Sequence, residues 1–247
     1  RYCDSIWIEK GLSKNTISSY SLDLNHFNSW LEHNGKNLLV CEESDLNLYL
    51  ATKFDSGISA SSINRSLSSI KGLYNWLMHS GMIKINPTEL IESPKIGRKL
   101  PTNLSEEDID QLLNAPDCST KKGKRDKTIL ELLYATGLRI SELTNLELSQ
   151  INLQRGIIKI LGKGGKERIV PIGETALGWI KDYMDNVRKD IINKDDNIFL
   201  FLSDKGKKIS RKSCWSFIHN YSKSILSNKP IYPHSLRHAF ATHLLNN

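Results

Sequence analysis

The hydrophobic pattern of this chain is helical along most of its length and changes to a β-strand pattern near residues 156–172. Elsewhere, apolar side chains recur at steps of three and four, as on the buried face of an amphipathic helix. Residues 156–161 and 168–172 are instead runs of β-branched residues, joined by the glycine- and lysine-rich residues 162–167. This arrangement is typical of a β-hairpin, and residues 198–202 are a further short strand candidate. The pattern predicts a mainly α-helical protein with a small antiparallel β-sheet.

The predicted helices fall into two groups separated by a proline-rich segment. Residues 86–102 contain three prolines and three basic residues with little apolar periodicity, which is typical of an extended linker. We therefore predict a helical domain over residues 1–88, a linker over 89–103 and an α+β domain over 104–247. The helices are expected near residues 5–8, at 13–31, 44–54, 59–79, from 105, at 126–135, from 141, at 175–188, 211–225 and from 233 onward.

The charge of the chain favours a polyanionic partner. A net charge of +7 and a pI near 9.1 fit DNA, RNA or an anionic membrane face. The four cysteines are widely spaced and form no C-x-x-C pair, so neither a zinc site nor a disulfide framework is predicted. No apolar run approaches the roughly 18 residues of a membrane span. We expect a cytoplasmic protein with no membrane partner.

Four basic or titratable residues stand in settings that favour a functional site. Arg139 lies between the helix-ending Gly137 and the start of a new helix, and Lys163 lies at the tip of the predicted hairpin. His234 and Arg237 are three residues apart on one predicted helix, so both side chains lie on one face. Together these residues could bind a phosphodiester.

Attack on a phosphodiester builds negative charge on its two non-bridging oxygens. Two arginines can hold those oxygens bidentately without a metal, and both stay protonated at any working pH. A lysine such as Lys163 suits the role of general acid toward the departing 5′ oxygen, and His234 can bind a phosphate oxygen or accept the proton of a nucleophile. No carboxylate cluster accompanies these residues, so we predict no metal and no cofactor.

Each motif also has a purely structural interpretation when taken alone. The glycine-rich turn at residues 162–167 lacks the P-loop pattern and is followed by a strand, so nucleotide hydrolysis is a poor interpretation. His238 and His243 follow His234 on the last helix without the H-E-x-x-H spacing of a zinc hydrolase. We interpret His243 as structural and His238 as a supporting residue. It is the order and combination of the motifs that favours a phosphodiester site.

Three segments together closely resemble the tyrosine recombinases, the phage-integrase-like family. They are ATGLRISEL at residues 135–143, GKGGKER at 162–168 and PHSLRHAFATHLL at 233–245. Within the family the chain is most similar to the bacterial Xer recombinases, over almost its whole length. The resemblance implies a helical core-binding domain and an α+β catalytic domain that clamp duplex DNA. It also implies strand cleavage and rejoining through a 3′-phosphotyrosine intermediate.

The resemblance assigns a role to each residue of the candidate site. It implies that Arg139 and Arg237 bind the phosphate, that Lys163 is the hairpin lysine and that His234 is the first histidine of the site. Glu142 matches the acidic residue that supports the first arginine.

The chain departs from the family pattern after Arg237. The family has a second His or Trp and then the nucleophilic tyrosine further downstream, whereas only ten residues follow Arg237 and none is tyrosine. We therefore expect a catalytic domain that is incomplete at its C-terminus and a chain that binds DNA without cleaving it. Because Arg1 already lies in a helical pattern, the front is expected to be trimmed too. Tyr232 is expected to pack at the start of the last helix and not to act as nucleophile.

The resemblance also implies a biological role and partners. These are site-specific DNA recombination in chromosome dimer resolution and segregation, a tetramer with a related recombinase on double-stranded DNA, and a DNA translocase as regulator. A phage or mobile-element integrase of the same family and a naturally truncated, non-catalytic DNA-binding protein stay open as alternatives. The target DNA sequence is not predicted. The candidates for DNA phosphate contacts are Lys14, Arg65, Lys71, Arg211 and Lys212.

Overall fold

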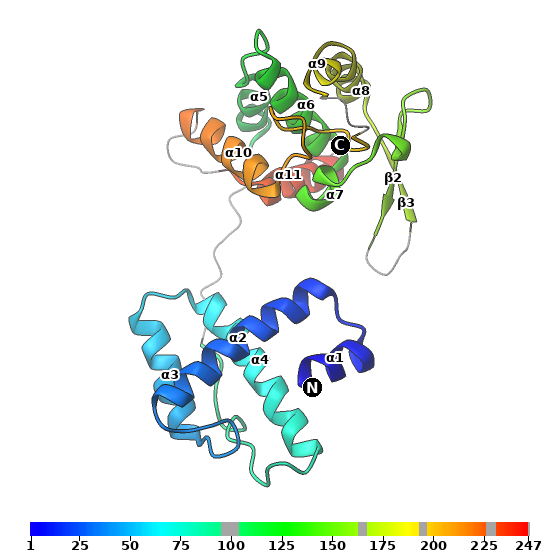
Figure 1. The fold of residues 1–247 in the computed structure, drawn as a ribbon. Coiled ribbons are helices and arrows are strands. Elements are labelled where there is room, and N and C mark those ends of the chain that lie inside the picture. Colours follow the sequence, from blue (N-terminus) through cyan, green and yellow to red (C-terminus); the bar gives the residue numbers. More distant parts are fainter. Residues whose placement is uncertain (95–103, 163–166, 193–196, 226–230, 247) are drawn as a thin grey trace. The chain divides into compact units, whose positions relative to one another are not determined.

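The chain divides into two compact units, Arg1–Lys99 and Leu100–Asn247 (Figure 1). The structure is a computed structural model that describes residues 1–94, 104–162, 167–192, 197–225 and 231–246, without the side chains of Lys10 and residues 244–246. Lys163 thus lies outside the described residues. The division falls within the segment predicted to be a linker.

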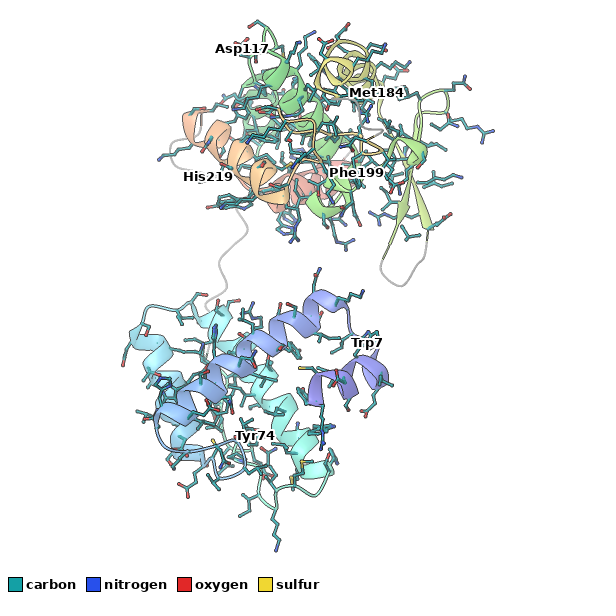
Figure 2. All side chains as sticks on the ribbon, viewed as in Figure 1. Trp7, Tyr74, Asp117, Met184, Phe199 and His219 are labelled. Atoms are coloured by element: carbon teal, nitrogen blue, oxygen red, sulfur yellow. The ribbon has the colours of Figure 1, made fainter. Side chains whose placement is uncertain are left out.

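The first unit is a bundle of four described helices: α1 (Tyr2–Lys10), α2 (Lys14–His33), α3 (Glu43–Asp55) and α4 (Ala60–His79). Ser13 and Ser59 cap the N-termini of the two long helices. The hydroxyl of Ser13 accepts a hydrogen bond of 3.2 Å from the amide of Thr16, and that of Ser59 accepts one of 3.3 Å from the amide of Ser62. Between the helices, the ring of Phe27 lies 4.9 Å from that of Tyr49 and 6.4 Å from that of Tyr74, which Figure 2 labels. Aromatic packing therefore fills this core.

The first unit extends further along the chain than the predicted boundary at residue 88. Ile91 is buried, and its carbonyl accepts a hydrogen bond of 2.5 Å from Nζ of Lys71. The carbonyl of Pro94 accepts one of 2.8 Å from the Asn64 side chain. Both donors lie on α4, so the chain through Pro94 is held against that helix, and this part of the segment predicted to be a linker is packed.

The second unit combines helices with a small sheet, which confirms the predicted fold class. Its elements are α5 (Glu106–Asn114), α6 (Lys121–Thr136), α7 (Ile140–Thr144), a 3₁₀-helix (Leu148–Gln150), β1 (Ile151–Asn152), β2 (Ile157–Leu161), β3 (Glu167–Pro171), α8 (Glu174–Tyr183), a π-helical turn (Met184–Arg188), α9 (Lys189–Ile191), α10 (Arg211–Ile225) and α11 (Pro233–Asn246).

Helix α6 is the centre of the second unit. It packs against α8 and α11 (Figure 1). Its residues Ile129, Leu130 and Leu132 have no exposed surface. It begins at Lys121, five residues before the predicted start, because the hydroxyl of Thr120 accepts a 2.9 Å hydrogen bond from the amide of Gly123. The predicted start was wrong because the capping threonine precedes the apolar periodicity.

The sheet has the order β1-β2-β3 and is antiparallel throughout. Ile158 and Ile160 of β2 face the core, and their partners on β3 are Val170 and Arg168. Because side chains alternate between the faces of a strand, Arg168 lies on the inward face of the hairpin. Strand β1, which is only two residues long, was not predicted.

The strand predicted at residues 198–202 is wrong. These residues make isolated bridges, from Phe199 to Glu147 and from Leu202 to Lys208. The guanidinium of Arg188 donates to the carbonyls of Phe199 and Leu200, each at 3.2 Å from Nε. The Arg188 side chain therefore occupies carbonyls that a neighbouring strand would use, while the side chains of Leu200, Phe201 and Leu202 are still buried. No helix in the described part of the chain is long and apolar enough to cross a membrane.

Candidate active site

The turn between α6 and α7 lies at the centre of the candidate site. Gly137 ends α6 with a φ of 57°, and its amide donates to the carbonyl of Leu133 at 2.9 Å. A Cβ at this position would overlap the ring of Phe240 on α11, at 2.8 Å from Cε1 and closer still to Cδ1. Both the left-handed backbone and the closeness of α11 thus require glycine.

Arg139 begins α7 and is held there by Glu142. Its amide donates to Oε2 of Glu142 at 2.9 Å, and its Nη1 donates to Oε1 at 3.1 Å. The Arg139 side chain is nevertheless 55% exposed. Glu142 thus holds the backbone amide and one guanidinium nitrogen of Arg139, and the other guanidinium donors stay available for an anion.

Arg168 is a member of this cluster that the sequence analysis missed. Its Nη1 and Nη2 donate to the two carboxylate oxygens of Glu142 at 3.1 and 2.8 Å, a bidentate pair that joins β3 to α7. The signal that could have found it is the alternation of β3. An arginine at an inward-facing position beside Ile160 needs an acidic partner.

The carboxylate of Glu142 is ionised at neutral pH. Burial raises its pKa, but hydrogen bonds from Arg168 and from the backbone and side chain of Arg139 outweigh burial and hold the pKa below its usual range. A charged acid therefore holds the hairpin and the arginine turn together.

Arg237 is brought to the same turn from the far end of the chain. It lies on α11, is half-buried, and its Nη1 donates to the carbonyl of Gly137, two residues before Arg139. His234 is exposed one turn earlier on α11. His238 is also exposed on α11, and no side-chain hydrogen bond among the described residues ties it to the turn. The structure thus gathers Arg139, Glu142 and Arg237 and does not place Lys163.

The five basic residues predicted to contact DNA differ in their surroundings. Arg65 makes a bidentate ion pair with Asp23, both bonds being 3.1 Å, and Lys71 is bonded to Ile91 as described above. The other three, Lys14, Arg211 and Lys212, are exposed in the first turns of α2 and α10. Contact with DNA phosphates stays a prediction for all five.

Two residues interpreted as structural make contacts inside the second unit. His243 contacts the hydroxyl of Tyr134 at 3.0 Å through Nδ1 and the carbonyl of Leu104 at 3.2 Å through Nε2. Tyr232 stacks on two aromatic rings of α10. Within the described ranges, the structure contains no group of three or more His, Cys, Asp or Glu that could hold a metal ion.

Comparison with protein families decides the relationship. Residues 102–247 match the phage integrase family, and residues 1–81 match the N-terminal SAM-like domain of phage integrases. The chain belongs to the phage integrase family. It is therefore a member of the tyrosine recombinases, as the resemblance of its three motifs predicts.

This tyrosine recombinase is similar along its full length to bacterial proteins named XerD. It is 42% identical over 246 residues to the tyrosine recombinase XerD of Pseudomonas aeruginosa, which covers 100% of this chain and 83% of that protein. It is 40% identical over 247 residues to XerD of Staphylococcus haemolyticus, covering 100% of this chain and 84% of that protein.

Solved structures of related recombinases share the fold. The XerA recombinase is 27% identical with a TM-score of 0.54, and the alignment covers 100% of this chain and 82% of that one. A lambda integrase dimer bound to a COC′ core site is 20% identical with a TM-score of 0.74, covering 98% of this chain and 87% of that one. A lambda integrase tetramer bound to a Holliday junction is 18% identical with a TM-score of 0.75, covering 100% and 69%.

Proposed function

We propose that this recombinase binds the scissile phosphate of duplex DNA between Arg139 and Arg237 and takes part in site-specific strand exchange. The observation that carries the proposal is that α6, α7 and α11 bring these arginines, nearly a hundred residues apart in sequence, to the single turn at residues 137–139. Two guanidinium groups, each positioned through Nη1 by Glu142 or by the carbonyl of Gly137, can bind two non-bridging oxygens through their other N–H groups without a metal.

The roles of the reacting groups are those that the chemistry of the residues and the resemblance to tyrosine recombinases assign. A tyrosine oxygen attacks phosphorus, the bond from phosphorus to the 5′ oxygen breaks, His234 accepts the tyrosine proton and Lys163 gives a proton to the leaving 5′ oxygen. The phosphotyrosine bond conserves the energy needed for rejoining, so no nucleotide cofactor is required. None of the eight tyrosines in the sequence follows Arg237. Of this reaction, we assign phosphate binding to Arg139 and Arg237 and the two proton transfers to His234 and Lys163.

We further propose that the protein resolves chromosome dimers and so acts in chromosome partition at cell division, in the cytoplasm. The support is its similarity along the full chain to proteins named XerD. It would act on double-stranded DNA in a tetramer with a related recombinase, with a DNA translocase as regulator. A solved lambda integrase tetramer on a Holliday junction, which shares this fold, supports such an assembly.

Integration of a phage or transposon is the second candidate function. It is favoured by the shared fold with lambda integrase and with the integrase of the Tn1549 transposon, which is 19% identical with a TM-score of 0.76. Deletion of the gene separates the two functions. Filamentous cells with unresolved chromosome dimers support dimer resolution, whereas loss of integration of a circular element without a division defect supports the second function.

Binding of labelled duplex DNA tests the phosphate site. We expect Arg139→Ala and Arg237→Ala each to weaken binding about tenfold or more, the value of a hydrogen bond to a charged group. Arg155→Ala is the matched control, because Arg155 is an exposed arginine of the same unit in the turn before β2. Equal losses in all three variants would contradict a phosphate site at residues 137–139.

Covalent trapping tests the chemistry in a chain that extends to a downstream tyrosine. A nicked duplex should trap a protein–DNA adduct, and Arg139→Ala or Arg237→Ala should abolish it. Unchanged trapping by either variant would refute its role.

A further inference from the structure

Three aromatic side chains, Trp215, His219 and Tyr232, form a cluster on the surface of the second unit, which we call the aromatic shelf. The ring centroids are 5.2 Å apart between Trp215 and His219, 5.7 Å between His219 and Tyr232, and 5.4 Å between Trp215 and Tyr232. The planes differ by only 4–22°. Trp215 is 48% exposed and Tyr232 is 36% exposed, so a stacked aromatic surface meets solvent (His219 is labelled in Figure 2).

The shelf adjoins the start of α11, the helix that carries His234 and Arg237. Tyr232 directly precedes Pro233, the first residue of α11, and its carbonyl accepts a 2.9 Å hydrogen bond from the amide of Ser235. This bond fixes the shelf to the helix turn that carries His234. On α10, Trp215 lies one turn after the exposed cation Arg211. Arg211 and Trp215 thus lie on one face of α10, and Tyr232 leads into the turn that carries the candidate catalytic histidine.

The packing of α10 does not account for the shelf. Helix α10 is anchored in the core by Cys214, Phe217 and Ile218, which are at most 8% exposed. In the shelf, Nδ1 of His219 is buried and has no hydrogen-bond partner within the described part of the chain, which costs stability. A cluster that exposes apolar rings and leaves a buried nitrogen unpaired points to a binding surface.

We propose that the aromatic shelf stacks on an unpaired nucleobase of the DNA strand whose phosphate lies at Arg139 and Arg237. The proposal rests on the proposed function and extends it with a binding site for a base. In a duplex, each base is stacked on both faces and presents only its edges to a protein. Only an unpaired base offers a face to an aromatic surface, and such stacking tolerates any sequence. Exchange of strands between two duplexes requires base pairs to open beside the reacting phosphate.

The experiment compares two labelled DNA probes of the same sequence, one fully paired and one with a short unpaired bulge at its centre. We expect the chain to bind the bulged probe at least about fivefold more tightly, the lower end of the value of stacking one base. Trp215→Leu and Tyr232→Leu should each reduce this preference, while Trp215→Phe keeps an aromatic face and should retain it. Trp7→Leu is the matched control, because Trp7 is 54% exposed in the first unit.

The outcomes separate this inference from the proposed function. Arg139→Ala should weaken binding to both probes equally and leave their ratio unchanged. Equal binding of the two probes by the unchanged chain, or a preference that survives both leucine variants, would overturn the shelf while leaving the phosphate site in place. Failure to bind either probe, or no effect of Arg139→Ala on either, would overturn the proposed function and the shelf with it.

Discussion

Replacement of Gly137 by alanine should destabilise the second unit and disturb the phosphate site together. Gly137 has a φ of 57°, and its added Cβ would overlap the ring of Phe240 on α11. The same residue supplies the carbonyl that accepts the hydrogen bond from Arg237. A change of one methyl group thus acts on the end of α6, on the packing of α11 and on one of the two arginines.

The size of the effect follows from three contributions. A residue with a Cβ in the left-handed region costs about 1–2 kcal/mol, and overpacking against a ring costs about 1–3 kcal/mol. Alanine also restricts the unfolded chain, which offsets about 0.4–1 kcal/mol. We therefore expect Gly137→Ala to lower the free energy of unfolding of the second unit by about 1–4.5 kcal/mol.

Amide hydrogen exchange measured by mass spectrometry can locate this loss, since exchange reports opening free energies segment by segment. Peptides from α6 and α11 should exchange faster in the variant, while peptides from α2 and α4 of the first unit serve as an internal control. In a Phe240→Ala background the overlap is absent, so Gly137→Ala should cost only about 1 kcal/mol, its backbone part. A loss below about 0.5 kcal/mol, the same loss in both backgrounds, or equal acceleration in α2 and α4 would refute the reasoning.

Four further predictions concern the ion pairs and the exposed lysine. Arg168→Gln should raise the pKa of Glu142, measured by NMR titration, and weaken DNA binding, with partial rescue by Arg168→Lys; an unchanged pKa would contradict the assigned contact. The pKa of Glu142 is lowered in the folded chain, so the contribution of this carboxylate to stability is complete above the ordinary glutamate pKa and is lost as pH falls through the lowered value. The stability of a Glu142→Gln variant, measured by denaturation across this pH range, should lack that part of the acid dependence. Arg65→Ala should cost the first unit about 2–3 kcal/mol in denaturant unfolding, because it leaves Asp23 buried without its bidentate partner. Lys14→Ala should leave stability unchanged and reduce the slope of log affinity against log salt by about 1, and an unchanged slope would remove Lys14 from the DNA contacts.

The sequence predicted most helices because their signals are local. The serine caps before α2 and α4 and the capping box at Ser105 each act within one helical turn, and the apolar period of three and four residues continues beyond them. The failure at residues 198–202 has a different origin. Those residues are apolar and mostly buried as a strand would be, but the carbonyls of Phe199 and Leu200 accept hydrogen bonds from Arg188. No local pattern shows which long-range donor satisfies a backbone group.

The site was predictable to the extent that its residues lie in recognisable motifs. Arg139, Glu142 and Arg237 were found from their segments, and the geometry brings them to one turn. Arg168 was missed although it lies in the motif at 162–168, because its role depends on which face of β3 it occupies and on a partner 26 residues away. The aromatic shelf was missed for the same reason, since Tyr232 meets Trp215 only after α10 and α11 have packed.

The balance of charge explains why an acid belongs beside phosphate-binding arginines. An unopposed carboxylate next to Arg139 would repel the phosphate that the arginine binds. Arg168 donates two hydrogen bonds to Glu142 and balances its charge, so the carboxylate positions Arg139 without cancelling the charge of Arg139. With Arg237 bonded to the neutral carbonyl of Gly137, the three guanidinium groups and one carboxylate leave a net charge of +2 around the turn. The phosphodiester carries one negative charge and gains more during attack, so this excess stabilises the transition state more than the bound DNA. Arg168 is a positioning residue in this arrangement, and its charge sustains the excess.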